Sequence, residues 1–340
     1  MDADAFASDA GTSTFDASVS TCQQRFHSRW DGLRDPHVRA LAWLLDAPDL
    51  LDPDASRWQG KIASLPEGAA HDARDWLMTL DAEPDSLQAT LQLNSFSRLG
   101  RYAEKLLASY FAHQKQLIAH GLQVRAGKEE TVGEFDFLLS DGARLLHWEF
   151  ATKFYLLCSS DPAWSKVQTA DYFVGPNLSD TLGAKMRKIL DRQLSLGQHP
   201  SAQALLLQPI DCAQALLRGW LFYRRGESIP VQALGITENH CRGWWCTLAE
   251  VDTHLSEVCV ILPRLAWLAP ARMTDEAVTS RAQLQSQLQA QFQFEAMPVM
   301  VASLHRSGDV WLETDRGFIV PDDWQGRADQ KLRALTAPSV

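Results

Sequence analysis

Residues 97–156 constrain the fold most, because a stripe with helical spacing is followed there by three runs that alternate like strands. The stripe consists of Leu99, Tyr102, Ala103, Leu106, Leu107, Tyr110 and Phe111. This 3.6-residue periodicity predicts a helix with one buried face. Residues 121–125, 133–139 and 144–156 then alternate with the period of two that is typical of strands. The segment is therefore expected to be a helix followed by three strands.

Further regular elements are predicted beyond this segment. Ser179 is a suitable N-cap for an amphipathic helix over residues 179–194. Residues 205–207 and 220–223 are apolar runs that we expect to form strands. The order helix, strand, strand, strand, helix, strand over residues 97–225 predicts an α/β core.

The rest of the chain divides by composition. Residues 1–24 are rich in Asp, Ala, Ser and Thr, and are expected to be a disordered tail. Residues 25–95 are predicted to be a helical N-terminal subdomain that precedes the core at 97–225. Residues 226–340 form a mixed α+β C-terminal region, with a Gln-rich helix at 281–293 followed by a small meander.

Charge and hydropathy restrict the partners. The longest apolar runs of the 340-residue chain fall short of a membrane span, and its first 20 residues contain no Lys or Arg. We therefore expect a cytoplasmic protein without a membrane partner. The net charge of −10 argues mildly against a protein that coats nucleic acid, although ten acids lie in residues 1–54.

The six cysteines are scattered along the chain, which favours reduced and mostly buried thiols. His240, Cys241 and Cys246 lie close enough in sequence to suggest zinc as an alternative. No C-x-x-C pair occurs, however, and structural zinc sites usually contain that spacing. Buried thiols are the preferred interpretation.

The hairpin predicted at residues 133–156 has an apolar and a polar face. The polar face carries Glu134, Asp136, His147, Glu149 and Lys153. A turn centred on the Asp-Gly pair would place Asp136 opposite His147 and Glu134 opposite Glu149. Three carboxylates and a lysine are then expected to converge.

Two opposed carboxylates need a compensating partner. At ~5 Å and an effective dielectric of about 20, their repulsion costs roughly 3 kcal/mol. A divalent cation, a shared proton or a salt bridge to Lys153 would offset that cost. Mg²⁺ or Mn²⁺ suits such an oxygen-rich site and supports phosphodiester hydrolysis, with Lys153 neutralising charge on the phosphate. The alternative is a solvated hairpin face with ordinary cross-strand ion pairs.

This arrangement of acids and lysine on a hairpin between two helices resembles the core of the PD-(D/E)xK nuclease superfamily. Several segments also resemble a bacterial family known as domain of unknown function 1853, which has been grouped with that superfamily: residues 98–104, 133–139, 147–155, 174–180, 262–270 and 316–321. The resemblance covers nearly everything after residue 25. It implies a restriction-endonuclease-like αβββαβ core at residues 97–225.

The resemblance also implies roles for individual residues. Asp136 matches the acid of the first metal-binding strand, Glu149 the second acid and Lys153 the catalytic lysine. Glu104 resembles an extra acid that many members carry on the first helix, and Glu134 is an auxiliary candidate ligand. Together these residues predict a Mg²⁺ or Mn²⁺ site.

Two departures from the superfamily pattern are visible. Phe135 stands where proline is usual before the first acid, and Lys153 follows Glu149 by four residues instead of two. The expected lysine position is Ala151. A shift of two residues keeps a side chain on the same strand face but moves it ~6.6 Å along the strand.

The expected function is a Mg²⁺-dependent nuclease that acts on DNA or RNA. Lys185, Lys188 and Arg192 are spaced i, i+3, i+7 on the second helix and could contact a phosphate backbone. They could equally form a merely solvated helix face. The alternative function is a catalytically inactive nuclease fold that binds nucleic acid or another protein.

Overall fold

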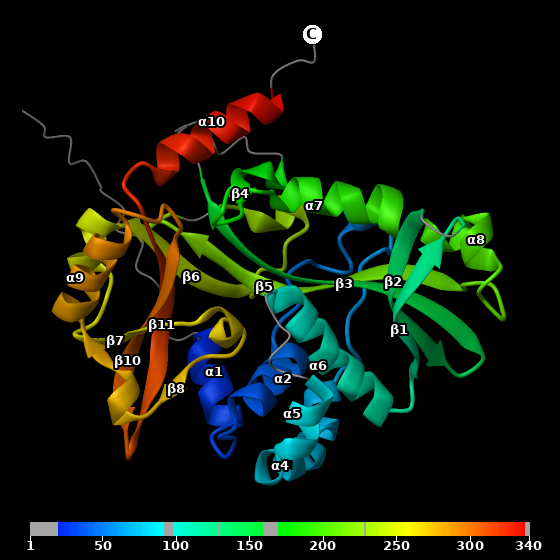
Figure 1. The fold of residues 1–340 in the computed structure, drawn as a ribbon, viewed down its shortest axis with the longest axis horizontal. Coiled ribbons are helices and arrows are strands. Elements are labelled where there is room, and N and C mark those ends of the chain that lie inside the picture. Colours follow the sequence, from blue (N-terminus) through cyan, green and yellow to red (C-terminus); the bar gives the residue numbers. More distant parts are fainter. Residues whose placement is uncertain (1–19, 92–97, 128–129, 159–168, 228, 337–340) are drawn as a thin grey trace, which may run out of the picture.

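The computed structural model describes residues 20–91, 98–127, 130–158, 169–227 and 229–336. Within these residues the strands form one 11-stranded mixed sheet, with helices on both faces (Figure 1). No helix of the described residues is long and apolar enough to cross a bilayer. The protein is therefore a mixed α/β structure, as the sequence predicted.

The sheet is continuous from the first strand to the C-terminal region. Its strands are β1 (Leu117–Arg125), β2 (Thr131–Asp141), β3 (Arg144–Leu157), β4 (Phe173–Val174), β5 (Cys212–Tyr223), β6 (Cys241–Thr247), β7 (Val258–Ile261), β8 (Arg272–Met273), β9 (Thr279–Ser280), β10 (Val299–Ser307) and β11 (Val310–Val320). The order is β1-β2-β3-β5-β6-β11-β10-β7-β9, with β4 beside β3 and β8 beside β11. Strands β1, β2 and β3 are antiparallel, whereas β3, β5, β6 and β11 run parallel. The predicted core and the C-terminal region thus share one sheet.

The helices cover the two sheet faces unequally. They are α1 (Cys22–Arg29), α2 (Pro36–Asp46), α3 (Ala69–Asp72), α4 (Arg74–Ala82), α5 (Asp85–Leu91), α6 (Leu99–His113), α7 (Leu182–Lys188), α8 (Pro200–Gln203), α9 (Arg281–Gln291) and α10 (Trp324–Thr336). Figure 1 shows α1, α2, α5 and α6 below the sheet, with α7 and α10 above it. Consequently β3 in the middle of the sheet is covered on both faces.

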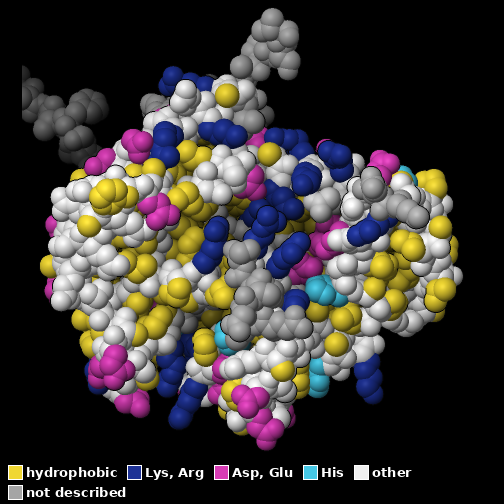
Figure 2. Space-filling model, viewed as in Figure 1, with side chains coloured by type: hydrophobic (Ala, Val, Ile, Leu, Met, Phe, Trp, Pro, Cys, Tyr) yellow, Lys and Arg dark blue, Asp and Glu magenta, His cyan; other side chains and the backbone are white. Residues whose placement is uncertain are grey.

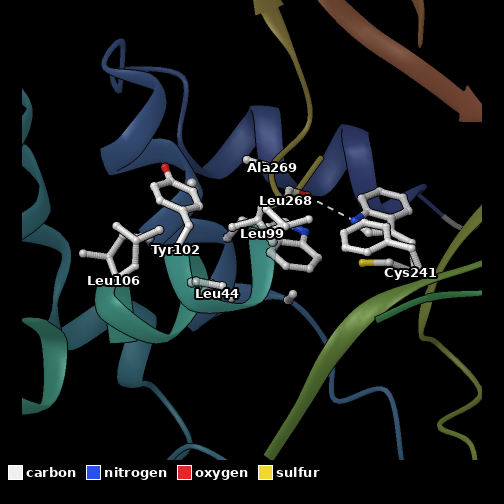
Figure 3. Close-up of a cluster of buried hydrophobic side chains, with 14 of the residues drawn as sticks. Leu44, Leu99, Tyr102, Leu106, Cys241, Leu268 and Ala269 are labelled. Carbon is white, nitrogen blue, oxygen red and sulfur yellow. Dashed lines mark hydrogen bonds between the residues drawn. The ribbon is translucent and has the colours of Figure 1, made fainter. Parts of the chain in front are cut away.

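Helix α6 packs as its sequence predicted. All seven residues of its apolar stripe are buried. They join a large core with side chains of α2 and with the loop before β8, including Leu44 and Leu268 (Figure 3). The indole of Trp220 on β5 donates to the Leu268 carbonyl across 3.1 Å. Helix α6 is therefore fixed against the sheet next to β1 and β2.

The hairpin between β2 and β3 has a different register from the predicted one. Asp141 pairs with Arg144, so the turn consists of Gly142 and Ala143. Gly142 has φ +62°, and a glycine at the first central position of a two-residue turn is typical of type II′ hairpins. His147 consequently faces Leu138, and the expected pairings of Asp136 with His147 and of Glu134 with Glu149 are both wrong.

The predicted strand at residues 205–207 is also wrong. These residues form an irregular connection, and β5 starts only at Cys212. Leu206 packs with Ile210 against a small cluster at the end of β2, whereas Leu207 is fully exposed. Three consecutive leucines predict a strand only weakly, because a short apolar run without periodicity does not identify one type of secondary structure.

The second helix begins later than the sequence indicated. Thr181, not Ser179, is the N-cap of α7 and accepts from the Ala184 N–H at 3.1 Å. Ser179 instead donates to the Asn177 side chain. After α7 the chain continues as a π-helical turn, η5 (Ile189–Gln193).

The remaining predictions concern the two ends of the chain. Helix α1 starts at Cys22, inside the predicted tail, while residues 1–19 lie outside the described residues. Helices α1 to α5 confirm a helical region before the core. The Gln-rich helix is α9, and β10 and β11 form a hairpin with its turn after Ser307.

Truncating the α6 stripe should destabilise the protein. Leu106 is fully buried, so Leu106→Ala should lower the free energy of unfolding by about 2–5 kcal/mol through lost burial and a cavity. Leu207→Ala is the matched control, because Leu207 is exposed and its truncation should change stability by less than about 0.5 kcal/mol. Urea titration followed by fluorescence measures both. Equal midpoints for the two variants would contradict this packing.

Candidate metal centre

A pocket of about 540 Å³ lies between α6, β2 and η5. It is lined by Arg101, Glu104, Val132, Gly133, Glu134, Asp136, Lys188, Arg192, Gln193 and Leu196. Figure 2 shows acidic side chains on this face next to a band of Lys and Arg. The pocket therefore brings together acids from α6 and β2 with cations from α7 and η5.

Three carboxylates meet in this pocket. One oxygen from each of Glu104, Glu134 and Asp136 lies within 4.8 Å of the other two, and each residue is half-buried. Within the described part of the chain, no other three His, Cys, Asp or Glu residues are grouped in this way. Glu104 and Glu134, which the sequence placed only as auxiliary candidates, thus join Asp136 directly. Oxygens at such separations can share one hard divalent cation.

Asp136 sits where strands β2 and β3 separate. The last backbone pair of the ladder is Phe137 with Trp148, and the next N–H, that of Phe150, donates to Asp136 Oδ2 at 2.9 Å. Burial, followed by the negative charge of Glu149, raises the pKa of Asp136 to about 8. The carboxyl therefore remains partly protonated at neutral pH unless a cation binds.

Glu149 lies beside Asp136 and is almost completely buried. Its Oε1 is 2.9 Å from His147 Nε2, and its Oε2 accepts from the Gln193 side-chain amide. Burial raises the pKa of Glu149 to about 7, and the charge of Lys185 opposes that shift. Glu149 adjoins the three-carboxylate group but is not one of the three residues whose oxygens lie within 4.8 Å of one another.

His147 is a neutral partner of Glu149. Burial lowers the pKa of His147 to about 4, so the contact between the two side chains is a hydrogen bond rather than an ion pair at neutral pH. Its ring also packs edge-on against Phe135, with centroids 4.7 Å apart. The imidazole therefore fixes the position of the Glu149 carboxylate from the buried side.

The cations around the acids come from α7 and η5. Lys185 is half-buried, and its charge acts on both Asp136 and Glu149. Burial lowers the pKa of Lys185, and its Nζ lies 3.4 Å from Gln193 Oε1. Lys188 and Arg192 are exposed and line the pocket itself. All three predicted basic residues thus face the carboxylates.

Lys153 is placed differently from the catalytic position implied by the resemblance. Its Nζ donates to Asp180 Oδ2 at 2.8 Å, and the Tyr155 hydroxyl donates to the same oxygen at 3.1 Å. Neither Lys153 nor Lys185 lines the pocket, but the charge of Lys185 acts on Asp136 and Glu149, whereas Lys153 is paired with Asp180.

One neighbour of the acids was missed by sequence reasoning. His120 on β1 lies 2.8 Å from Glu104 and stacks on Phe137. Arg101, which precedes Glu104 by three residues on the same helix, also lines the pocket. No sequence pattern pointed to His120, because its contact with Glu104 depends on how β1 packs against α6.

The fold and the site define a mixed α/β protein with a carboxylate pocket at the open end of a β-hairpin. A family model described as "Domain of unknown function (DUF1853)" matches residues 39–320, and the chain belongs to this family. All the acids and cations of the pocket lie within the matched segment. No match was found among curated proteins or among solved structures.

The buried acids predict an unusual dependence of stability on pH. The pKa of Asp136 is near its ordinary value of ~3.9 in the unfolded chain and about 8 in the folded chain, so its contribution to stability is lost as pH rises from about 4 to 8. Asp136→Asn cannot ionise. In EDTA it should match the wild type near pH 5 and exceed its stability by about 1–3 kcal/mol near pH 9.

Chemical denaturation at both pH values tests this expectation. Asp141→Asn is the matched control, because Asp141 is exposed at the end of the same strand. It should give nearly the same small change at both pH values. A stability of Asp136→Asn below that of the wild type at pH 9 would contradict the buried carboxylate pair.

Proposed function

We propose that this protein is a Mg²⁺- or Mn²⁺-dependent phosphodiester hydrolase of the PD-(D/E)xK type that cleaves nucleic acid. The observation that carries the proposal is the shared pocket of three clustered carboxylates and of Lys188 and Arg192. Carboxylates suit a hard divalent cation, and exposed cations suit the phosphates of the substrate. Carboxylates alone would indicate only a metal site, and exposed cations alone would indicate only phosphate binding.

The arrangement of elements supports a restriction-endonuclease-like core. From α6 onward the chain forms three antiparallel strands, β1 to β3, then the two-residue β4, α7, the four-residue α8 and β5, which is parallel to β3. Apart from the short β4 and α8, this is the αβββαβ order that the resemblance implies. The acids lie on the first helix and on the β2–β3 hairpin, where that core would place its metal ligands.

Asp136, Glu134 and Glu104 fit a divalent cation by their oxygen chemistry and their spacing. When bound, such an ion lowers the pKa of a coordinated water and offsets charge on the scissile phosphate. Glu149 lies behind Asp136, and its charge raises the pKa of that carboxyl. His147 and Gln193 hold Glu149 in place from two sides.

Lys185 is the residue that we assign as the catalytic cation. It is the lysine whose charge acts on both buried acids, and Gln193 limits its freedom. A lysine on α7 would neutralise negative charge on the phosphate as the bond breaks. Lys188 and Arg192 would bind the flanking phosphates, with Arg101 on the opposite wall of the pocket.

A second candidate function rests on Lys153. The lysine that the resemblance implies as catalytic is paired with Asp180, away from the carboxylates. This contact favours a nuclease fold that binds nucleic acid or another protein without cleaving it. The two candidates differ in whether metal-dependent cleavage occurs.

Cleavage assays decide between them. Purified protein should cut labelled single- or double-stranded DNA or RNA in Mg²⁺ or Mn²⁺ and not in EDTA, and Asp136→Ala should lower the rate at least ~10³-fold. Glu295→Ala, at an exposed acid outside the pocket, is the matched control and should leave the rate unchanged. Absence of cleavage on every substrate would favour the binding protein.

The two lysines give a sharper comparison. Lys185→Ala should lower kcat by about 100-fold or more, because Lys185 is the lysine whose charge acts on both buried acids. Lys153→Ala should lower kcat less than about 10-fold, since Lys153 contacts Asp180 and not the pocket. Steady-state kinetics on the best substrate measures both variants. The reverse ranking would return the catalytic role to Lys153.

A further inference from the structure

A second pocket, of about 320 Å³, lies where α1 meets the start of β6. It is lined by Cys22, Arg25, Phe26, Arg29, Trp43, Asp46, Ala47, Pro48, Asn239 and Cys241. None of these residues lines the carboxylate pocket. Two cysteines that are 219 positions apart in the sequence thus share the wall of one solvent-connected cavity.

The Cys22 sulfur is surrounded by hydrogen-bond donors. Arg25 Nη2 donates to Cys22 Sγ at 3.2 Å, and the Cys241 thiol and the backbone N–H of Arg242 also donate to it. The Cys241 thiol, the Arg25 charge and the N–H donors together lower the pKa of Cys22 to about 7 against the opposing effect of burial. A thiolate held in this way is a nucleophile near neutral pH.

Cys241 is a suitable second thiol. It is almost completely buried at the first position of β6, and burial keeps its thiol protonated by raising its pKa (Figure 3). Cys22 is half-buried and reaches the pocket. The pair therefore consists of an accessible, activated thiol and a protected neighbour.

We propose that Cys22 and Cys241 are a redox modification site, in which hydrogen peroxide converts the two thiols into a reversible disulfide that links α1 to β6. The Cys22 thiolate attacks the peroxide, so that an S–O bond forms, the O–O bond breaks and hydroxide leaves. This hydroxide becomes water by taking up the proton that Cys22 released on ionising. The Cys241 sulfur then attacks the Cys22 sulfenic acid, an S–S bond forms and the S–O bond breaks. The Cys241 proton leaves with the second hydroxide as water. Two thiols are oxidised, and one hydrogen peroxide is reduced to two waters.

Helix α1 is held on the sheet by contacts other than the two thiols. Gln23 donates to Glu313 at 3.3 Å, and His27 Nε2 lies 3.1 Å from the Glu313 carbonyl oxygen, so α1 is already fixed against β11. Strand β11 is the sheet neighbour of β6. The disulfide would therefore tether the N-terminal helix to the sheet.

The test is oxidation of the full-length protein with a few equivalents of hydrogen peroxide at neutral pH. After remaining thiols are blocked, non-reducing peptide mass spectrometry should find a Cys22–Cys241 crosslink, and dithiothreitol should remove it. The oxidised protein should show an upward shift in Tm, since a crosslink across so long a loop restricts the unfolded chain. Oxidation of Cys22 to sulfinic acid without a crosslink would overturn the proposal.

Variants separate the pair from ordinary cysteine oxidation. Cys22→Ser should abolish the crosslink and the Tm shift, whereas Cys212→Ser, at another half-buried cysteine, should leave both intact. Arg25→Gln removes a donor to the sulfur and should slow alkylation of Cys22 about threefold or more. Arg29→Gln is its control, because Arg29 lines the same pocket but pairs with Asp46. Equal alkylation rates of Cys22 and Cys212 in the wild type would also overturn the proposal.

Discussion

The burial of two neighbouring carboxylates at the end of the β2–β3 ladder is the constraint on which the site depends. Asp136 takes a backbone N–H that the separating strands leave without a ladder partner, and Glu149 is held by His147 and Gln193. Neither carboxyl has a cation in direct contact among these partners, so burial raises both pKa values, to about 8 and about 7. A site of this kind costs stability and is typical of functional centres.

The rest of the fold positions groups around these two acids. Helix α6 is fixed by its buried stripe and places Glu104 near β2, while α7 and η5 cross the other face and bring Lys185 to the acids. The parallel pairing of β3 with β5 keeps the hairpin in the middle of a large sheet. The acids therefore sit on rigid elements, which is what the proposed metal site would require.

The sequence predicted the elements better than their contacts. The α6 stripe and the strands of the hairpin were legible because each follows a strong period of 3.6 or two residues. The pairing register of the hairpin could not be predicted in the same way. It depends on which two residues form the turn, and the positive φ of Gly142 places that turn one residue later than predicted. That single shift moves Asp136 from His147 to the neighbourhood of Glu149. Local patterns also do not encode that Lys185 on α7 lies near the acids while Lys153 on β3 pairs with Asp180, because both contacts depend on where α7 lies relative to β3.

Calorimetric titration of Mn²⁺ into the full-length protein tests the central claim most directly. A divalent cation must displace the proton that Asp136 retains, so binding should tighten as the pH rises from 6 to 8.5 and should release protons. Asp136→Ala should abolish binding, whereas Asp141→Ala, at the exposed end of the same strand, should retain it. Binding of equal strength in the wild type and in folded Asp136→Ala, or no binding at either pH, would contradict the account.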